Sequence, residues 1–156
     1  MQKDYKIPTG IRLLLRKCCH AVLHVEEKTG DYEVNVSFLD DEQIQQLNRE
    51  YRGKDIPTDV LSFPSGKDGA FEISPETGVA MLGDIAISVQ MVYRQAEQFG
   101  HSLQREFASL TVHSMLHLLG YDHEAGGIEA AWMREKEEDI LTQLGLPHDT
   151  SYSEEE

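Results

Sequence analysis

The segment HSMLHLLGYDH, residues 113–123, places three histidines at positions i, i+4 and i+10. Residues four apart on a helix lie one turn above each other on the same face, so the rings of His113 and His117 can converge on one ion about 2 Å from each nitrogen. Gly120 can adopt the left-handed conformation that ends a helix, and the resulting turn brings His123 back toward the same point. The segment therefore predicts a metal site with three histidine ligands.

The alternative for each histidine alone is an ordinary imidazole, and for the set it is a structural metal. Structural zinc normally has four protein ligands, commonly cysteines, whereas three histidines leave one position for water. Asp122 offers a fourth ligand, but beside His123 it is better placed to orient a ring or cap the turn. We therefore expect one catalytic zinc ion per chain.

The histidine spacing equals that of the metzincin proteases, H-E-x-x-H-x-x-G-x-x-H. Their glutamate takes a proton from zinc-bound water, and Ser114 stands at its position here. A serine hydroxyl cannot act as that base near neutral pH, which disfavours proteolysis. Zinc alone lowers the pKa of bound water from about 15.7 to about 7, so a hydroxide nucleophile needs no strong neighbouring base.

A second polar segment, YRGKDIPTDVLSFP at residues 51–64, contains the cationic residues Arg52 and Lys54 where a predicted helix ends and a loop begins. The planar fork of Arg52 suits phosphate oxygens, and a surface salt bridge is its alternative. Asp59 and Asp84 stand beside apolar runs, where they can line the site or, as we favour, serve as turn or capping residues.

Apolar periodicity predicts an α+β fold. Helical spacing predicts helices at about 11–25, 42–52, 89–99, 102–119 and 127–144, and alternation or short apolar runs predict strands at 33–39, 59–63 and 79–87. The second helix is expected to bury Ile44, Leu47 and Tyr51. Strands interspersed with helices indicate one small mixed sheet covered by helices, in which parallel and antiparallel pairings cannot be separated. The metal-binding helix is expected to have a zincin-like arrangement.

The length of 156 residues fits one domain, for which we expect residues 1–150 as a catalytic domain and 151–156 as a disordered acidic tail. The net charge is −14, of which residues 124–156 carry −8, whereas residues 1–20 carry +4. An acidic balance argues against a polyanionic partner, but its concentration at the C-terminal end weakens that objection.

The composition predicts a cytoplasmic protein. No apolar stretch reaches the roughly 18 residues that span a bilayer, and no apolar region of a secretory signal follows Lys3 and Lys6. Cys18 and Cys19 are neighbours on a predicted helix, where their side chains diverge and do not easily reach disulfide geometry. We expect both to be core thiols.

Taken together, these blocks resemble the YbeY endoribonucleases of bacteria over most of the chain. The family signature H-G-x-L-H-L-x-G-Y-D-H matches residues 113–123, except that Ser114 replaces glycine. The pattern Y-R-x-x-D-x-P-T-x-V-L-S-F-P matches residues 51–64, and LGDI at residues 82–85 matches a third block. Ser114 removes no ligand, and its hydroxyl can bond the carbonyl four residues back.

The resemblance implies a single-strand-specific, metal-dependent endoribonuclease that hydrolyses RNA phosphodiester bonds. The family acts in 3'-end maturation of 16S ribosomal RNA and in ribosome quality control, so the implied partners are ribosomal RNA and ribosomal proteins or the small ribosomal subunit. By the same resemblance, His113, His117 and His123 hold zinc, and Arg52 binds or stabilises the scissile phosphate. Whether water or the RNA 2'-hydroxyl attacks stays open.

Two other functions remain as alternatives. The shared histidine spacing and the acidic charge allow a zinc hydrolase of a small or peptide substrate, although the missing glutamate weighs against it. The acidic charge also allows a ribosome-assembly binding factor whose metal only stabilises the fold, because an acidic chain binds RNA weakly in a nonspecific manner.

Overall fold

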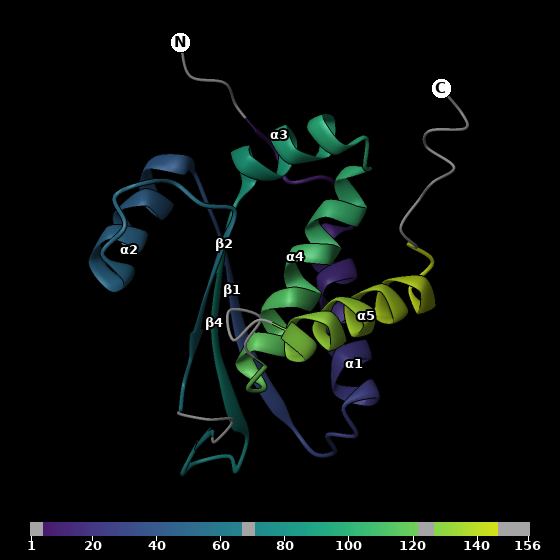
Figure 1. Cartoon of the computed structure of the whole chain (residues 1–156). Helices are drawn as coiled ribbons and strands as arrows, with labels where there is room; N and C mark the ends of the chain where they lie inside the picture. Colours follow the sequence, from purple (N-terminus) through teal and green to yellow (C-terminus); the bar gives the residue numbers. More distant parts are fainter. Residues whose placement is uncertain (1–4, 67–70, 122–126, 147–156) are drawn as a thin grey trace.

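Five helices and four strands form within the residues that the computed structural model describes, 5–66, 71–121 and 127–146 (Figure 1). The helices are α1 (Ile11–Val25), α2 (Asp41–Arg52), α3 (Val89–Phe99), α4 (Leu103–Leu118) and α5 (Gly127–Gln143). The strands are β1 (Tyr32–Leu39), β2 (Val60–Pro64), β3 (Glu72–Ile73) and β4 (Ala80–Ser88). The predicted α+β class is confirmed. The expected acidic tail lies outside the described residues.

The sheet is mixed, with β4 between β1 and β2. β1 runs parallel to β4, with Val36 opposite Ile85, and β2 runs antiparallel to it, with Ser62 opposite the same residue. β3 also pairs antiparallel with β4, nearer the start of that strand. β2 is therefore an edge strand, and one of its long sides is available to line a site.

Helices cover both faces of the sheet (Figure 1). α1 and α4 pack on one face and α5 packs against α4, so that the main core includes Ile85 and Met115. α2 lies on the opposite face over a smaller core formed by Ile44, Leu61 and Ala86. Because side chains alternate along a strand, the side chain of Leu61 on β2 points toward α2, and those of the adjacent Val60 and Ser62 point toward α4.

Polar side chains cap the N-termini of α2 and α3, close to the starts that apolar periodicity predicts. The Asp40 side chain accepts from the backbone N–H of Gln43 in a capping box, and Ser88 accepts from the N–H of Met91. Gly53 ends α2 in the left-handed conformation, at φ 70°. Each cap satisfies backbone groups that the helix itself leaves unpaired, which is why local sequence locates these boundaries.

The prediction that α2 buries Tyr51 is wrong, because its side chain is 66% exposed. The residue lies in the last turn of α2, where its ring meets Phe63 edge-on with 5.3 Å between centroids. Asn48 is buried instead and donates through Nδ2 to the carbonyl of Ile56 at 3.0 Å. The helix thus uses a buried amide to hold the following loop.

The remaining expectations concern the cysteines and the membrane. Cys18 is buried and Cys19 is half-buried, and both are unpaired thiols. Burial raises the pKa of Cys18 to about 12 and that of Cys19 to about 11. No helix within the described part of the chain is long and apolar enough to cross a membrane.

Candidate active site

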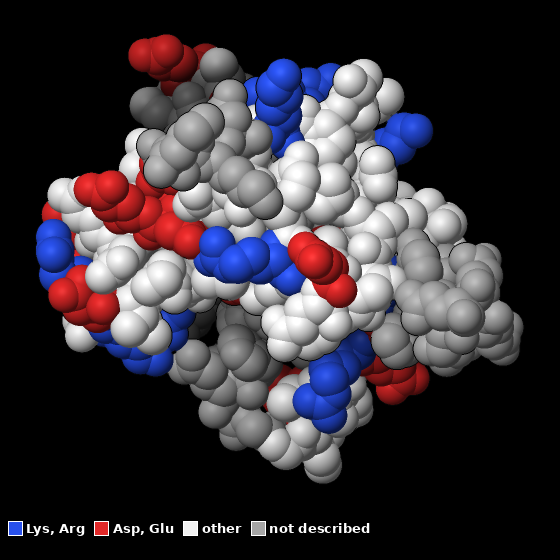
Figure 2. All heavy atoms as spheres, turned by 90° about the horizontal axis from the view of Figure 1, so that it is seen from above, with Lys and Arg blue, Asp and Glu red and all other residues white. Residues whose placement is uncertain are grey.

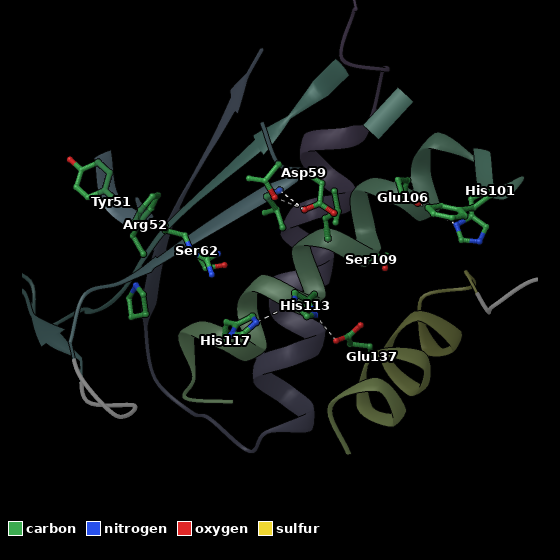
Figure 3. Close-up of a pocket in the computed structure, with 16 residues that line it drawn as sticks. Tyr51, Arg52, Asp59, Ser62, His101, Glu106, Ser109, His113, His117 and Glu137 are labelled. Carbon is green, nitrogen blue, oxygen red and sulfur yellow. Dashed lines mark hydrogen bonds and ion pairs between the residues drawn. The ribbon is translucent and has the colours of Figure 1, made fainter. Parts of the chain in front are cut away.

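A cleft of about 890 Å³ runs along β2, between the end of α2 and one face of α4 (Figure 3). It is lined by Tyr51, Arg52, Thr58, Asp59, Val60, Ser62, Phe63, Pro64, Phe99, His101, Glu106, Ser109, Leu110, His113, His117 and Glu137. Two sequence segments that are far apart, 51–64 and 99–117, thus form opposite walls of one site.

One face of α4 supplies much of this wall. Glu106, Leu110, His113 and His117 follow one another at intervals of four, three and four residues, which is the spacing of neighbours on a helix surface. Ser102 starts this helix by accepting from the backbone N–H of Arg105. Most of α4 is buried, Glu106 and Leu110 included, so the core holds the helix while the half-buried His113 and His117 line the cleft.

The rings of His113 and His117 converge at one point of the cleft. Their Nε2 atoms are 3.1 Å apart, and the rings are tilted by 74°. Two nitrogens bound to one tetrahedral zinc at about 2.0–2.1 Å lie about 3.3 Å apart, so the pair suits a shared ion. The third predicted ligand, His123, lies outside the described residues. Within the part of the chain that is described, no group of three or more His, Cys, Asp or Glu residues could hold a metal.

Glu137 orients the first of these rings. Its Oε2 lies 2.7 Å from Nδ1 of His113, and both side chains are largely shielded from solvent. A carboxylate that accepts from Nδ1–H selects the tautomer whose Nε2 lone pair points at the ligand position. No sequence pattern predicts this role for Glu137, because it is one of several acidic residues on α5 and no spacing distinguishes it.

Arg52 lies in the same cleft as the histidine pair (Figure 3). It is the last residue of α2, and Gly53 turns the chain away directly after it. Among the described residues that line the cleft, it is the only lysine or arginine. The structure therefore brings together three of the four site residues that the sequence predicts.

The two aspartates differ in position. The Oδ1 atom of Asp59 accepts from the backbone N–H of Val60, the first residue of β2, at 2.7 Å, and Asp59 also lines the cleft. Asp84 on β4 accepts from Nδ2 of Asn35 at 3.1 Å. It is not among the described residues that line the cleft. Asp122 lies outside the described residues.

The far end of the cleft contains a buried carboxylate that no sequence motif predicts. Glu106 is only 6% exposed, and its Oε1 lies 3.3 Å from Nδ1 of His101. Burial raises the pKa of Glu106, and the negative charge of Asp59 adds to this, whereas the hydrogen bond and charge of His101 act in the opposite direction. Phe99 lies beside His101 with its side chain 57% exposed.

Comparison with known proteins identifies the family. The family model described as Endoribonuclease YbeY matches residues 1–145. The chain belongs to the YbeY family. A relative from Chloroflexus aurantiacus named "Endoribonuclease YbeY" is 50% identical over 137 residues, which cover 87% of this chain and 88% of the relative. One of the same name from Caldanaerobacter subterraneus is 47% identical over 149 residues, covering 88% and 90%.

A solved structure agrees with this assignment. The solution structure of TM1509 from Thermotoga maritima is 29% identical and superimposes with a TM-score of 0.60, covering 88% of this chain and 85% of that one. The two chains therefore share one fold over most of their length.

The third block of the YbeY resemblance, residues 82–85, lies in β4 behind the cleft. Gly83 has a φ of +141°, and a Cβ atom there would lie 2.2 Å from the carbonyl oxygen of Phe63 on β2. Only glycine lets the two strands approach this closely. The block thus positions the strand that lines the site and does not itself enter the cleft.

Ser114, the departure from the YbeY signature, is fully buried. The bond that its hydroxyl can make to the carbonyl four residues back, at Leu110, is not formed, and Oγ has no partner among the described residues. Thr111 makes the corresponding bond, to the carbonyl of Phe107 at 2.9 Å. The position after His113 therefore faces the core, where a glutamate of the metzincin kind would be an unpaired buried charge.

Proposed function

We propose that this chain is a metal-dependent endoribonuclease that hydrolyses phosphodiester bonds of single-stranded RNA. The observation that carries the proposal is the convergence of the His113 and His117 Nε2 atoms, 3.1 Å apart, in the cleft that also contains Arg52. The names of the relatives, "Endoribonuclease YbeY", support RNA as the substrate.

Each residue has a defined role in this proposal. His113 and His117 hold a zinc ion through Nε2, with His123 as the third ligand, and Glu137 keeps the first ring in the binding tautomer. When bound, the ion supplies a Lewis acid for a phosphate oxygen and acidifies water. Arg52 binds the scissile phosphate and neutralises the negative charge that grows on its oxygens in the transition state.

The proposal extends to the setting of the reaction. The substrate is ribosomal RNA, including the 3' end of 16S RNA, and the enzyme acts in the cytoplasm in ribosome maturation and quality control. The net charge of −14 supports delivery by a ribosomal protein or the small subunit, because few cations are available for nonspecific phosphate contacts. Residues 1–150 form the catalytic domain in this proposal, and 151–156 form an acidic tail.

The experiment is cleavage of a labelled single-stranded ribosomal RNA fragment by the parent protein, with chelator, and with zinc restored. His113→Ala is assayed in parallel, and His24→Ala, an exposed histidine on α1, is the matched control. We expect chelator and His113→Ala to abolish cleavage and bound zinc together, while His24→Ala behaves as the parent. Equal cleavage by His113→Ala would exclude the proposed metal mechanism.

The second candidate is a ribosome-assembly binding factor with a structural metal, which the acidic charge favours. It predicts that a zinc-loaded parent protein binds the small ribosomal subunit but cleaves no RNA. A peptide hydrolase is less well supported, because Ser114, at the position of the metzincin glutamate, is buried and cannot act as that base.

A further inference from the structure

We propose that the two ends of the cleft are nucleobase-stacking subsites, formed by Phe99 with His101 at one end and by Tyr51 at the other. They hold the unstacked bases of the nucleotides on either side of the cleaved phosphate. The inference rests on the proposed endoribonuclease function and adds the residues that select single-stranded RNA.

The exposure of these aromatic rings is the first observation. Tyr51 and Phe99 are each more than half exposed, yet both line the cleft. Phe99 is the last residue of α3, directly before Gly100, and Tyr51 is the second-last residue of α2, two residues before Gly53; both glycines are in the left-handed conformation. The helix ends therefore present these rings to the cleft and do not pack them into the core.

Neighbouring rings hold both in place. Tyr51 contacts Phe63 with 5.3 Å between centroids, and Phe99 contacts His101 with 6.1 Å between centroids. His101 is itself fixed by Glu106, whose buried carboxylate lies 3.3 Å from Nδ1. Rings that are already ordered lose little conformational entropy when a planar ligand stacks on them.

The two ends lie on opposite sides of the histidine pair. Figure 3 shows Tyr51 and Arg52 at one end, His101 and Glu106 at the other, and His113 between them. A phosphate beside His113 would thus have an aromatic surface on each side. Bases in a duplex are paired and stacked on one another, so only a single strand can present its bases to both surfaces.

The charges favour bases over phosphates at the Phe99 end. Arg52 is the only lysine or arginine among the described lining residues, and it lies at the Tyr51 end. The other end has Glu106 and no such cation in the described lining, which suits a neutral base better than a phosphate. On the face seen in Figure 2, acidic and basic side chains are interspersed, so the described residues of that face form no continuous basic track for an RNA backbone.

The test measures steady-state cleavage of a short single-stranded oligonucleotide by Phe99→Ala and Tyr51→Ala. Stacking on one aromatic side chain is typically strong enough that its loss should raise KM on the order of tenfold, with a smaller change in kcat. Phe99→Trp and Tyr51→Phe should restore the lost KM, because they keep a ring. Trp132→Ala is the matched control, since this aromatic residue on α5 is 59% exposed and is not among the described lining residues.

Abasic oligonucleotides assign each ring to a base. We expect removal of the base on one side of the cleaved bond to raise the KM of the parent. The same removal should not raise KM further in the alanine variant that lacks the ring on which that base stacks. Removal of the base on the other side should show the same relationship with the second variant. Fully additive effects, or alanine variants with the KM of the parent, would overturn the subsites.

A binding measurement separates this inference from the proposed function. In a Trp132→Phe background, Phe99→Trp carries the only tryptophan, and an intact oligonucleotide should quench its fluorescence more than an abasic one does. A parent protein that cleaves RNA, together with equal quenching by both oligonucleotides, would remove only the subsites. A parent that neither binds nor cleaves RNA would overturn both proposals.

Discussion

Glu137 on α5 accepts a hydrogen bond at 2.7 Å from Nδ1 of His113 on α4, a residue 24 positions earlier in the chain. The contact ties the orientation of a proposed zinc ligand to the packing of two helices. It also explains how a solvent-accessible cleft can keep one imidazole in a single tautomer.

Removing this carboxylate should weaken zinc binding. We expect Glu137→Ala to lower zinc affinity by about 10- to 100-fold, the usual effect of losing such a partner, because the ring is no longer held in the binding tautomer. Competition with a chromophoric chelator measures the affinity. Glu135→Ala, an exposed acidic residue on the same helix, is the control. Equal affinities for the two variants would show that Glu137 does not orient the ligand.

Replacing Arg52 should separate catalysis from metal binding. We expect Arg52→Ala to lower kcat/KM for RNA by about 100-fold or more while the zinc content stays that of the parent. Arg52→Lys should recover only part of the loss, because an ammonium group cannot form two parallel bonds to phosphate. Arg49→Ala is the control, since this exposed arginine on α2 forms a surface ion pair with Asp55. Parent-like cleavage by Arg52→Ala would exclude the phosphate role.

A methyl group at Gly83 should disrupt the wall of the site. The added Cβ would lie 2.2 Å from the Phe63 carbonyl oxygen, and both atoms belong to paired strands that cannot move apart without losing ladder hydrogen bonds. We expect Gly83→Ala to lower the free energy of unfolding by at least about 3 kcal/mol. Gly53→Ala is the control, because it has φ +70° but open space around the Cβ position, and it should cost about 1–2 kcal/mol. Urea unfolding compares them, and equal losses would contradict the close approach.

Ser114 and Thr111 should respond in opposite directions to loss of their hydroxyl groups. Both are fully buried on α4, but only the threonine hydroxyl has a partner, the carbonyl of Phe107. We expect Ser114→Ala to raise the free energy of unfolding by about 1 kcal/mol and Thr111→Val to lower it by about 1 kcal/mol. Thermal and urea unfolding of the three proteins test this. Destabilisation by Ser114→Ala would mean that its hydroxyl makes a stabilising contact.

The burial of Glu106 should make stability depend on pH. Its pKa is raised above the ordinary value of 4.5 chiefly by burial, so the folded state binds this proton more tightly than the unfolded state does. The resulting stabilisation is complete below the unfolded pKa and is lost as pH rises through the folded pKa. Relative to Glu106→Gln, the parent should therefore lose stability across this window, by up to about 1.4 kcal/mol per pH unit.

Urea unfolding of both proteins from pH 4 to pH 8 measures that difference. A parent that instead gains stability over Glu106→Gln as pH rises would show that His101 stabilises the carboxylate by more than its burial costs.

Local sequence was sufficient for the features that depend on the geometry of one helix or strand. The spacing of His113 and His117 places them on one face of α4 because every α-helix has the same number of residues per turn. Asp40, Ser88 and Gly53 mark helix ends because capping is a short-range interaction. Alternating apolar residues located β1 for the same reason.

Only the tertiary structure decided which distant segments meet. The parallel pairing of β1 with β4, the contact of Glu137 with His113, and the exposure of Tyr51 each depend on how whole elements pack. A glutamate that orients a ligand and one that faces solvent have the same local sequence signal. The sequence by itself therefore determined two metal-binding candidates on one helix face. The packing of α2, α4 and α5 around the edge strand β2 determined the cleft in which they lie. Contacts between these elements join residues that no helical or strand period relates, so local sequence does not predict them.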